Sequence, residues 1–135
     1  AWSGANRSSL IRIPAARGKG TRVELRSPDP SCNPYITFAA VLAAGLDGIR
    51  NKIDPGDNRE ENIFELSDKG LKDFGIETLP STLNDSAKYL AEDELLIEAL
   101  GTHVINSVLS LAKAEWDSYR IQVHPWEIER YLNTV

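Results

Sequence analysis

The chain has 135 residues, of which 41% are hydrophobic and 26% charged, as expected for one globular domain with an apolar core. Its net charge of −5 at pH 7 argues against a nucleic-acid-binding surface spread over the whole chain. Cys32 is the single cysteine, which excludes an intrachain disulfide and favours a reducing environment. No apolar run approaches the ~20 residues of a membrane span, and the first four residues lack the pattern of a secretory signal. We therefore expect a cytoplasmic protein that binds neither nucleic acid nor membrane.

Positive charge is concentrated near the N-terminus. Residues 1–28 contain a single acid, Glu24, among six basic residues: Arg7, Arg12, Arg17, Lys19, Arg22 and Arg26. Two strands are predicted here, one over residues 8–13 that is ended by Pro14 and one over residues 21–27, so that residues 1–28 form a basic antiparallel hairpin. The link over residues 14–20, with glycines on both sides of Lys19, is either a mobile loop over a phosphate or an ordinary exposed hairpin loop.

The second predicted strand has charged residues at alternate positions. A period of two places Arg22, Glu24 and Arg26 on one face of the strand. This face is either a surface ladder of ion pairs, which the pattern alone favours, or a site where the arginines bind an anion and Glu24 binds Mg²⁺ or Mn²⁺. Several cations beside a metal-binding carboxylate are the groups expected for phosphoryl transfer, although one carboxylate is too few for a complete metal site.

The rest of the chain is predicted to be mainly helical. Asn33 followed by Pro34 is typical of a helix start, and the helix over residues 33–53 is apolar almost all round, which predicts a buried helix. Residues 54–80 are polar and irregular and are interpreted as a surface excursion. Residues 81–135 are predicted to form C-terminal helices and a tail, with Ser81 as a cap and Gly101 as a stop. The fold class is therefore α+β, an N-terminal hairpin followed by a mainly helical segment.

The longest C-terminal helix is predicted over residues 102–122. Its apolar residues recur at steps of three and four and form one stripe: Ile105, Leu109, Ala112, Trp116 and Tyr119. His103 and His124 lie at opposite ends of this helix, too far apart to share a metal ion, and are interpreted as capping or packing residues. The chain ends on an apolar edge that is expected to dock onto a neighbour: Ile128, Tyr131, Leu132 and Val135.

Several short motifs together resemble the C-terminal part of the catalytic domain of bacterial-type glutamine synthetase, and the resemblance extends over nearly the whole chain. They are Asn6-Arg7-Ser8, Leu10-Ile11-Arg12-Ile13-Pro14, Arg22-Val23-Glu24-Leu25-Arg26, Asp29-Pro30, Asn33-Pro34-Tyr35, Leu42 to Ile49 and Gln122 to Glu127. Because the family's catalytic domain begins well before the residue matched by Ala1, and the sequence has no initiator methionine, we expect residues 1–135 to be a fragment of a longer protein.

The resemblance implies an activity and roles for named residues. Members of this family join glutamate to ammonia with ATP, through γ-glutamyl phosphate, using Mg²⁺ or Mn²⁺. By resemblance, Glu24 is a metal ligand and Arg26 binds the glutamate substrate or its acyl phosphate. Arg7 resembles the catalytic arginine that contacts both glutamate and the transferred phosphate of ATP. The remaining ATP-phosphate contacts implied by the resemblance are Arg12, Lys19 and Arg22.

The resemblance also implies an assembly and a mode of control. The family forms a homo-oligomer, a dodecamer of two stacked hexameric rings, and the apolar C-terminus resembles its docking tail. Members regulated by adenylylation carry a tyrosine where this chain has Phe64, so we expect no such modification here. The other metal ligands of the family have no counterpart in the chain, and we expect residues 1–135 alone to be inactive.

Two alternatives remain open at this point. One is a paralogous γ-glutamyl ligase of the same fold that uses an amine in place of ammonia. The other is a non-catalytic module, in which the basic hairpin binds an anionic partner and the apolar tail assembles oligomers. For the module, binding is expected to survive the loss of the negative charge of Glu24.

Overall fold

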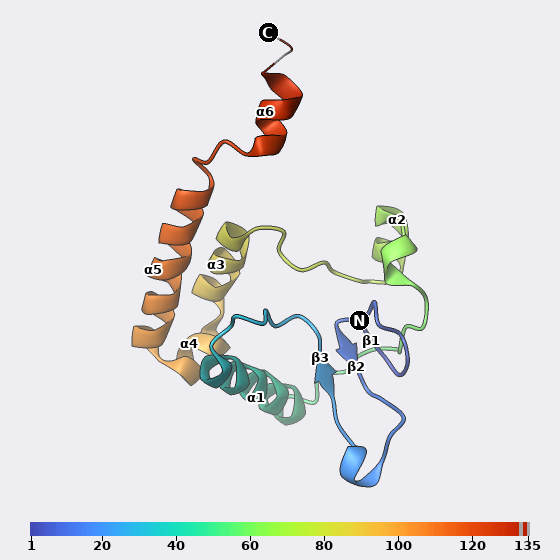
Figure 1. The fold of residues 1–135 in the computed structure, drawn as a ribbon. Coiled ribbons are helices and arrows are strands. Elements are labelled where there is room, and N and C mark those ends of the chain that lie inside the picture. Colours follow the sequence, from blue (N-terminus) through green and yellow to red (C-terminus); the bar gives the residue numbers. More distant parts are fainter. Residues whose placement is uncertain (133, 135) are drawn as a thin grey trace. The chain divides into compact units, whose positions relative to one another are not determined.

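The computed structural model describes residues 1–132 and 134, so Val135 of the predicted apolar edge lies outside the described residues. The α+β fold class is confirmed (Figure 1). The strands are β1 (Trp2–Ser3), β2 (Ile11–Arg12) and β3 (Glu24–Leu25). The α-helices are α1 (Pro34–Arg50), α2 (Asp68–Asp73), α3 (Leu83–Glu92), α4 (Glu94–Leu100), α5 (Thr102–Tyr119) and α6 (Pro125–Tyr131), with short 3-10 helices at η1 (Gly18–Gly20) and η2 (Ile63–Glu65). The chain divides into two units, residues 1–79 and 80–135.

The predicted hairpin is present as the pair β2 and β3. These strands are antiparallel, with Ile11 opposite Leu25 and Arg12 opposite Glu24. The structure adds a strand that sequence reasoning missed, because β1 runs parallel to β2 on its other side and gives the order β1-β2-β3. A two-residue strand is too short to show an alternating pattern, so its pairing has no sequence signal.

Residues 54–80 have no buried residue and are joined to β1 by hydrogen bonds. The backbone N–H of Arg59 donates to the carbonyl of Trp2 at 2.8 Å, and the indole N–H of Trp2 donates to the carbonyl of Gly56, also at 2.8 Å. Helix α2 was not predicted, although Ser67 caps it by accepting from the backbone N–H of Gly70 at 3.2 Å. Its short length and internal glycine hide the helical period.

Helix α1 starts as predicted, because the side chain of Asn33 accepts from the backbone N–H groups of Tyr35 and Ile36 and Pro34 opens the helix. The prediction that it is buried is wrong for the described residues, because α1 has no buried residue. Its large apolar side chains are mostly exposed, including Tyr35 at 85% and Ile49 at 75%. An all-round apolar helix is normally covered by neighbours, and within residues 1–79 no strand or other helix packs closely against α1.

The second unit is built from packed helices. Helix α5 packs on both α3 and α4, and Ile105 of α5 is its most buried apolar residue, 3% exposed. Of the predicted stripe, Leu109, Ala112 and Trp116 are half-buried. Helix α3 is capped by Thr82, one residue later than predicted, because the Thr82 hydroxyl accepts from the N–H of Asp85 at 3.1 Å. Helix α5 ends at Tyr119, three residues earlier than predicted.

Gly101 separates α4 from α5 with a φ of +80°, which only glycine adopts without strain.

No single helix among residues 1–132 and 134 is both long and apolar enough to cross a membrane; α4 and α5 meet that criterion only when counted together across a 113° bend.

Helix α6 begins at Pro125, as predicted. The backbone N–H of His124 donates to the Glu127 carboxylate at 2.8 Å, and the imidazole packs against the ring of Tyr119, with 5.1 Å between ring centres. His124 thus has the capping and packing surroundings that the sequence suggested. The described apolar residues near the C-terminus are exposed, at 47% for Ile128 and 71% for Leu132.

Candidate active site on the basic hairpin

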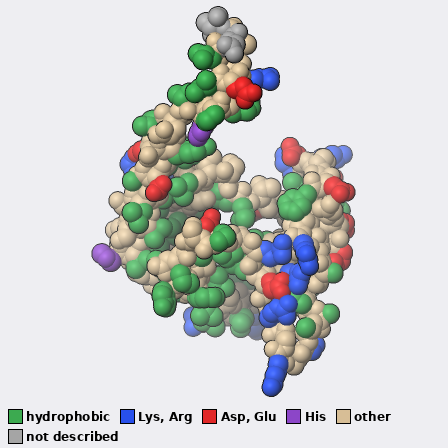
Figure 2. Space-filling view, viewed as in Figure 1, with side chains coloured by type: hydrophobic (Ala, Val, Ile, Leu, Met, Phe, Trp, Pro, Cys, Tyr) green, Lys and Arg blue, Asp and Glu red, His purple; other side chains and the backbone are tan. Residues whose placement is uncertain are grey.

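Glu24 is the centre of the charged cluster on the hairpin. Its Oε2 lies 3.0 Å from Nε of Arg12, and its Oε1 accepts from Nε of Arg22 at 2.8 Å and lies 2.7 Å from a terminal nitrogen of the same guanidinium. The side chains of Glu24 and Arg12 are largely shielded, at 27% and 19% exposure. Figure 2 shows a patch of basic side chains gathered around one acidic group. One carboxylate is therefore held between two guanidinium groups.

The arginine partners of Glu24 differ from those that the alternating pattern predicted. The sequence placed Glu24 between Arg22 and Arg26, but Arg12 occupies the position expected for Arg26. The reason is the register, which puts Arg12 directly opposite Glu24 on the neighbouring strand. Cross-strand pairing depends on register, which the strand's own period cannot reveal.

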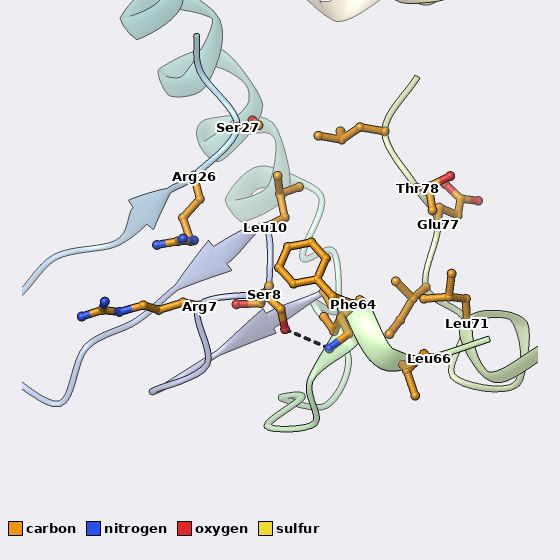
Figure 3. A pocket seen from close by; sticks show the side chains of 15 residues that line it. Arg7, Ser8, Leu10, Arg26, Ser27, Phe64, Leu66, Leu71, Glu77 and Thr78 are labelled. Atoms are coloured by element: carbon orange, nitrogen blue, oxygen red, sulfur yellow. Dashed lines mark hydrogen bonds between the residues drawn. The ribbon is translucent and has the colours of Figure 1, made fainter. Parts of the chain in front are cut away.

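Arg7 and Arg26 lie together elsewhere on the same unit. Both line a cavity of about 520 Å³ between the hairpin and residues 63–79. Figure 3 shows the two arginine side chains extending to the same side, away from Leu66 and Leu71. Both are exposed, and the backbone N–H of Arg26 is fixed to the carbonyl of Leu10 at 3.0 Å. The cavity thus has a cationic rim and a mainly apolar wall: Leu10, Ile63, Phe64, Leu66, Leu71, Ile76 and Leu79.

The link between β2 and β3 is a short ordered turn. Lys19 is exposed in the middle of η1, and the guanidinium of Arg17 donates to the carbonyls of Pro14 and Ala16 at 2.7 and 2.9 Å. Arg22 also donates to the carbonyl of Gly20 at 3.1 Å. The two arginines stabilise the turn and leave Lys19 exposed at its tip. An exposed Lys19 is compatible with a loop that contacts a phosphate and with an ordinary exposed hairpin loop, so both interpretations of the link stay open.

Several polar residues around Arg7 form long-range hydrogen bonds that were not predicted from the sequence. Asn6, Ser8 and Glu60 join the loop of residues 4–10 to residues 56–63, which lie more than fifty positions later. The backbone N–H of Gly4 donates to Glu60 at 2.9 Å, and this bond is the main reason that the pKa of Glu60 lies below its ordinary value of 4.5. No local pattern predicts such pairing, and the Asn6-Arg7-Ser8 motif was the only available signal.

The described residues do not form a complete metal site. Residues 1–132 and 134 hold no cluster of three or more His, Cys, Asp or Glu side chains arranged to bind a metal ion. Glu24 is a hard oxygen ligand of the kind that Mg²⁺ and Mn²⁺ prefer, but both of its oxygens are engaged by arginines. Any metal held by Glu24 therefore needs ligands from outside the described residues.

The chain was compared with known protein families. The family model described as glutamine synthetase, catalytic domain, matches residues 1–131. The chain belongs to the glutamine synthetase family. Curated relatives include the glutamine synthetases of Methanosarcina mazei, 54% identical over 132 residues, and of Thermotoga maritima, 50% identical over 131 residues. These alignments cover 98% and 97% of this chain and 30% of each relative.

A solved structure supports the same assignment. The structure of apo GmaS without ligand matches with a TM-score of 0.75 and 36% sequence identity, covering 96% of this chain and 29% of that one. The family resemblance found in the motifs is thereby confirmed. Because the chain spans about 30% of the length of its glutamine synthetase relatives, the activity and partners of the whole enzymes reach it only as a proposal.

Proposed function

We propose that this chain forms part of an ATP-dependent ligase that makes glutamine from glutamate and ammonia through γ-glutamyl phosphate. The observation that carries the proposal is the clustering of cations on one hairpin of a glutamine synthetase family chain: two guanidiniums on Glu24 and two on the rim of the adjoining cavity. Phosphoryl transfer needs such groups, because the protein mainly positions anionic reactants and neutralises developing charge. A cytoplasmic homo-oligomer, a dodecamer of two stacked hexameric rings, goes with this proposal.

Each cation has a separate part in the proposal. Arg26 binds the glutamate substrate or its acyl phosphate, and Arg7 contacts both glutamate and the transferred phosphate of ATP. Arg12, Lys19 and Arg22 bind the phosphates of ATP. A guanidinium has five N–H groups, and the ion pairs with Glu24 use only some of those on Arg12 and Arg22, so donors remain for an anion.

The proposal includes Mg²⁺ or Mn²⁺ with Glu24 as one ligand. The described residues offer this single ligand and not a full site, so no step is assigned to the metal. For the same reason we propose that residues 1–135 alone are inactive.

The test joins this chain to the rest of a relative. In a chimera, residues 1–135 replace the aligned part of Methanosarcina mazei glutamine synthetase, and formation of γ-glutamyl hydroxamate from glutamate, hydroxylamine, ATP and Mg²⁺ is measured. We expect activity in the chimera and none in the isolated chain. Glu24→Gln should lower the rate about 10²-fold, as expected for loss of a charged active-site group, whereas Glu98→Gln on the exposed face of α4 should leave it unchanged.

The same assay separates the alternatives. The residues upstream of this segment discriminate the amine-using ligase, so that alternative is tested on the longer protein with its own upstream part: a preference for methylamine over ammonia as acceptor would favour it. A folded chimera without turnover, whose binding of phosphate survives Glu24→Gln, would favour the non-catalytic module and contradict the proposal.

A further inference from the structure

Arg7 lies between two residues whose side chains are tied to a distant segment. The amide nitrogen of Asn6 donates to the backbone carbonyls of Arg59 and Glu61. Figure 3 shows the second tie, in which the hydroxyl of Ser8 accepts from the backbone N–H of Ile63 at 2.9 Å. The loop that carries Arg7, residues 4–10, is thus fixed on both sides of the arginine to residues 59–63.

Asn6 uses the full hydrogen-bonding capacity of its side chain. While its two N–H groups bond the distant carbonyls, its Oδ1 accepts from the backbone N–H of Ser8 at 2.8 Å and from the Ser8 hydroxyl at 2.7 Å. A primary amide has two donors and one oxygen with two lone pairs, and all are engaged here. A carboxylate would lose the donors and an alanine would lose every bond.

The backbone of Asn6 is fixed as well. Its carbonyl accepts from the hydroxyls of Ser3 at 2.9 Å and Ser9 at 3.1 Å. These two serines are the buried polar side chains of the described chain, at 0% and 2% exposure. Bonds shielded from water hold position better than exposed ones, so the residue before Arg7 is a rigid point in the loop.

Arg7 itself has no such support. Its side chain is exposed, and among residues 1–132 and 134 its guanidinium has neither a hydrogen-bond nor an ion-pair partner. The backbone position from which Arg7 extends, on the side away from Leu66 and Leu71 (Figure 3), is therefore set by the bonds of Asn6 and Ser8.

We propose that Asn6 is a positioning residue for Arg7, and that Asn6 and Ser8 couple the placement of Arg7 to residues 59–65, the segment that carries Phe64. The inference rests on the proposed function, in which Arg7 meets the substrate and the transferred phosphate. Because a displacement of about 1 Å in an active-site group can lower a rate about 10²-fold, loosening the Asn6 bonds should slow turnover without removing any group that touches substrate.

The experiment uses the chimera described above. Asn6→Ala should lower kcat at least about tenfold and leave the KM for ATP within about twofold, because Arg12, Lys19 and Arg22 are untouched. Ser8→Ala should act in the same direction, and Ser8→Thr, which keeps the hydroxyl, should restore most of the rate. Asn106→Ala, on the exposed face of α5, is the matched control and should leave kcat unchanged.

Hydrogen exchange followed by mass spectrometry tests the coupling without depending on activity. Asn6→Ala should speed exchange both in residues 4–10 and in residues 59–65, and Asn106→Ala in neither. Exchange that rises in only one segment would overturn the coupling, even if the chimera proves inactive and the proposed function fails. Faster exchange in both segments with kcat unchanged would overturn the positioning role and leave a structural tie.

Discussion

Each of the two units of the chain is stabilised internally by a different kind of interaction. In residues 1–79 the most buried side chains are Ser3, Ser9 and Pro14, and hydrogen bonds join the N-terminal loop to residues 56–63. Among residues 80–132 and 134 the most buried side chain is the apolar Ile105, and α5 packs on α3 and α4. The first unit thus depends on directional bonds that place functional groups, and the second on non-directional burial that stabilises helices. The predictions below test this contrast, beginning with the largest effect.

The second unit, residues 80–135, should lose stability when its most buried apolar side chain is shortened. Ile105→Ala should lower the free energy of unfolding by about 2–5 kcal/mol, because it removes buried methylenes and leaves a cavity. Leu111→Ala on the same helix is the control, because Leu111 is 68% exposed and should cost less than about 0.5 kcal/mol. Urea unfolding followed by far-UV circular dichroism measures both. Equal effects would show that α5 is not packed as described.

Replacing one glycine by alanine in each unit should change the free energy of unfolding in opposite directions. Gly101→Ala should destabilise by about 1–3 kcal/mol, since alanine at a φ of +80° is strained. Gly45→Ala, inside α1 with open space around its Cβ position, should instead stabilise that helix by about 0.5–1 kcal/mol. Thermal and urea unfolding of the two variants give the comparison, and destabilisation by Gly45→Ala would contradict the exposed placement of α1.

The first unit should be sensitive to the loss of a single buried hydroxyl. Ser3→Ala should cost about 1 kcal/mol, because it removes the bond to the carbonyl of Asn6 and the contact of 3.1 Å with the hydroxyl of Ser9. Exchange of the amides in residues 4–10 should rise with it. Ser81→Ala, at an exposed position, is the matched change and should affect neither quantity. No difference between the two variants would mean that the buried serines do not hold the loop.

The smallest expected effect is a difference in how salt changes the pKa values of two carboxylates, Glu60 and Asp117. The pKa of Glu60 is lowered mainly by the backbone N–H of Gly4, and that of Asp117 mainly by hydrogen bonds from Lys113 and Arg120. Because both values are depressed in the folded chain, each carboxylate favours folding above its unfolded pKa, and this contribution is lost as the pH falls through the lower folded pKa. NMR titration at low salt and at about 1 M, where the Debye length is about 3 Å, should move the pKa of Asp117 toward its ordinary value more than that of Glu60. The opposite order would contradict the assigned causes.

The parts of the fold that were predicted are those with local signals in the sequence. The helix start at Asn33 and Pro34 and the stop at Gly101 are local signals that were confirmed, and the stripe along α5 was confirmed except at Tyr119, which is 57% exposed. The pairing of β1 with β2 and the bonds from the Asn6 amide to residues 59–61 were not predicted, because their partners are distant backbone groups, which carry no residue-specific signal.

The candidate site was predicted in composition rather than in arrangement. The sequence identified the cations and the one carboxylate of the hairpin, but assigned Arg26 to Glu24 where the structure has Arg12. Register decided this, and a period of two within one strand contains no information on it. The roles of Arg7, Arg12, Lys19, Arg22, Glu24 and Arg26 stay predictions.

The exposed α1 has a consequence for local stability. A helix of 17 residues with no buried residue depends largely on its own cap and backbone bonds, whereas most helical stability in proteins comes from packing of a buried face. Helix α1 should therefore open to coil far more often than α5, in the manner of an independent peptide in helix–coil equilibrium. The segment whose secondary structure was easiest to predict is thus expected to be among the first to lose it.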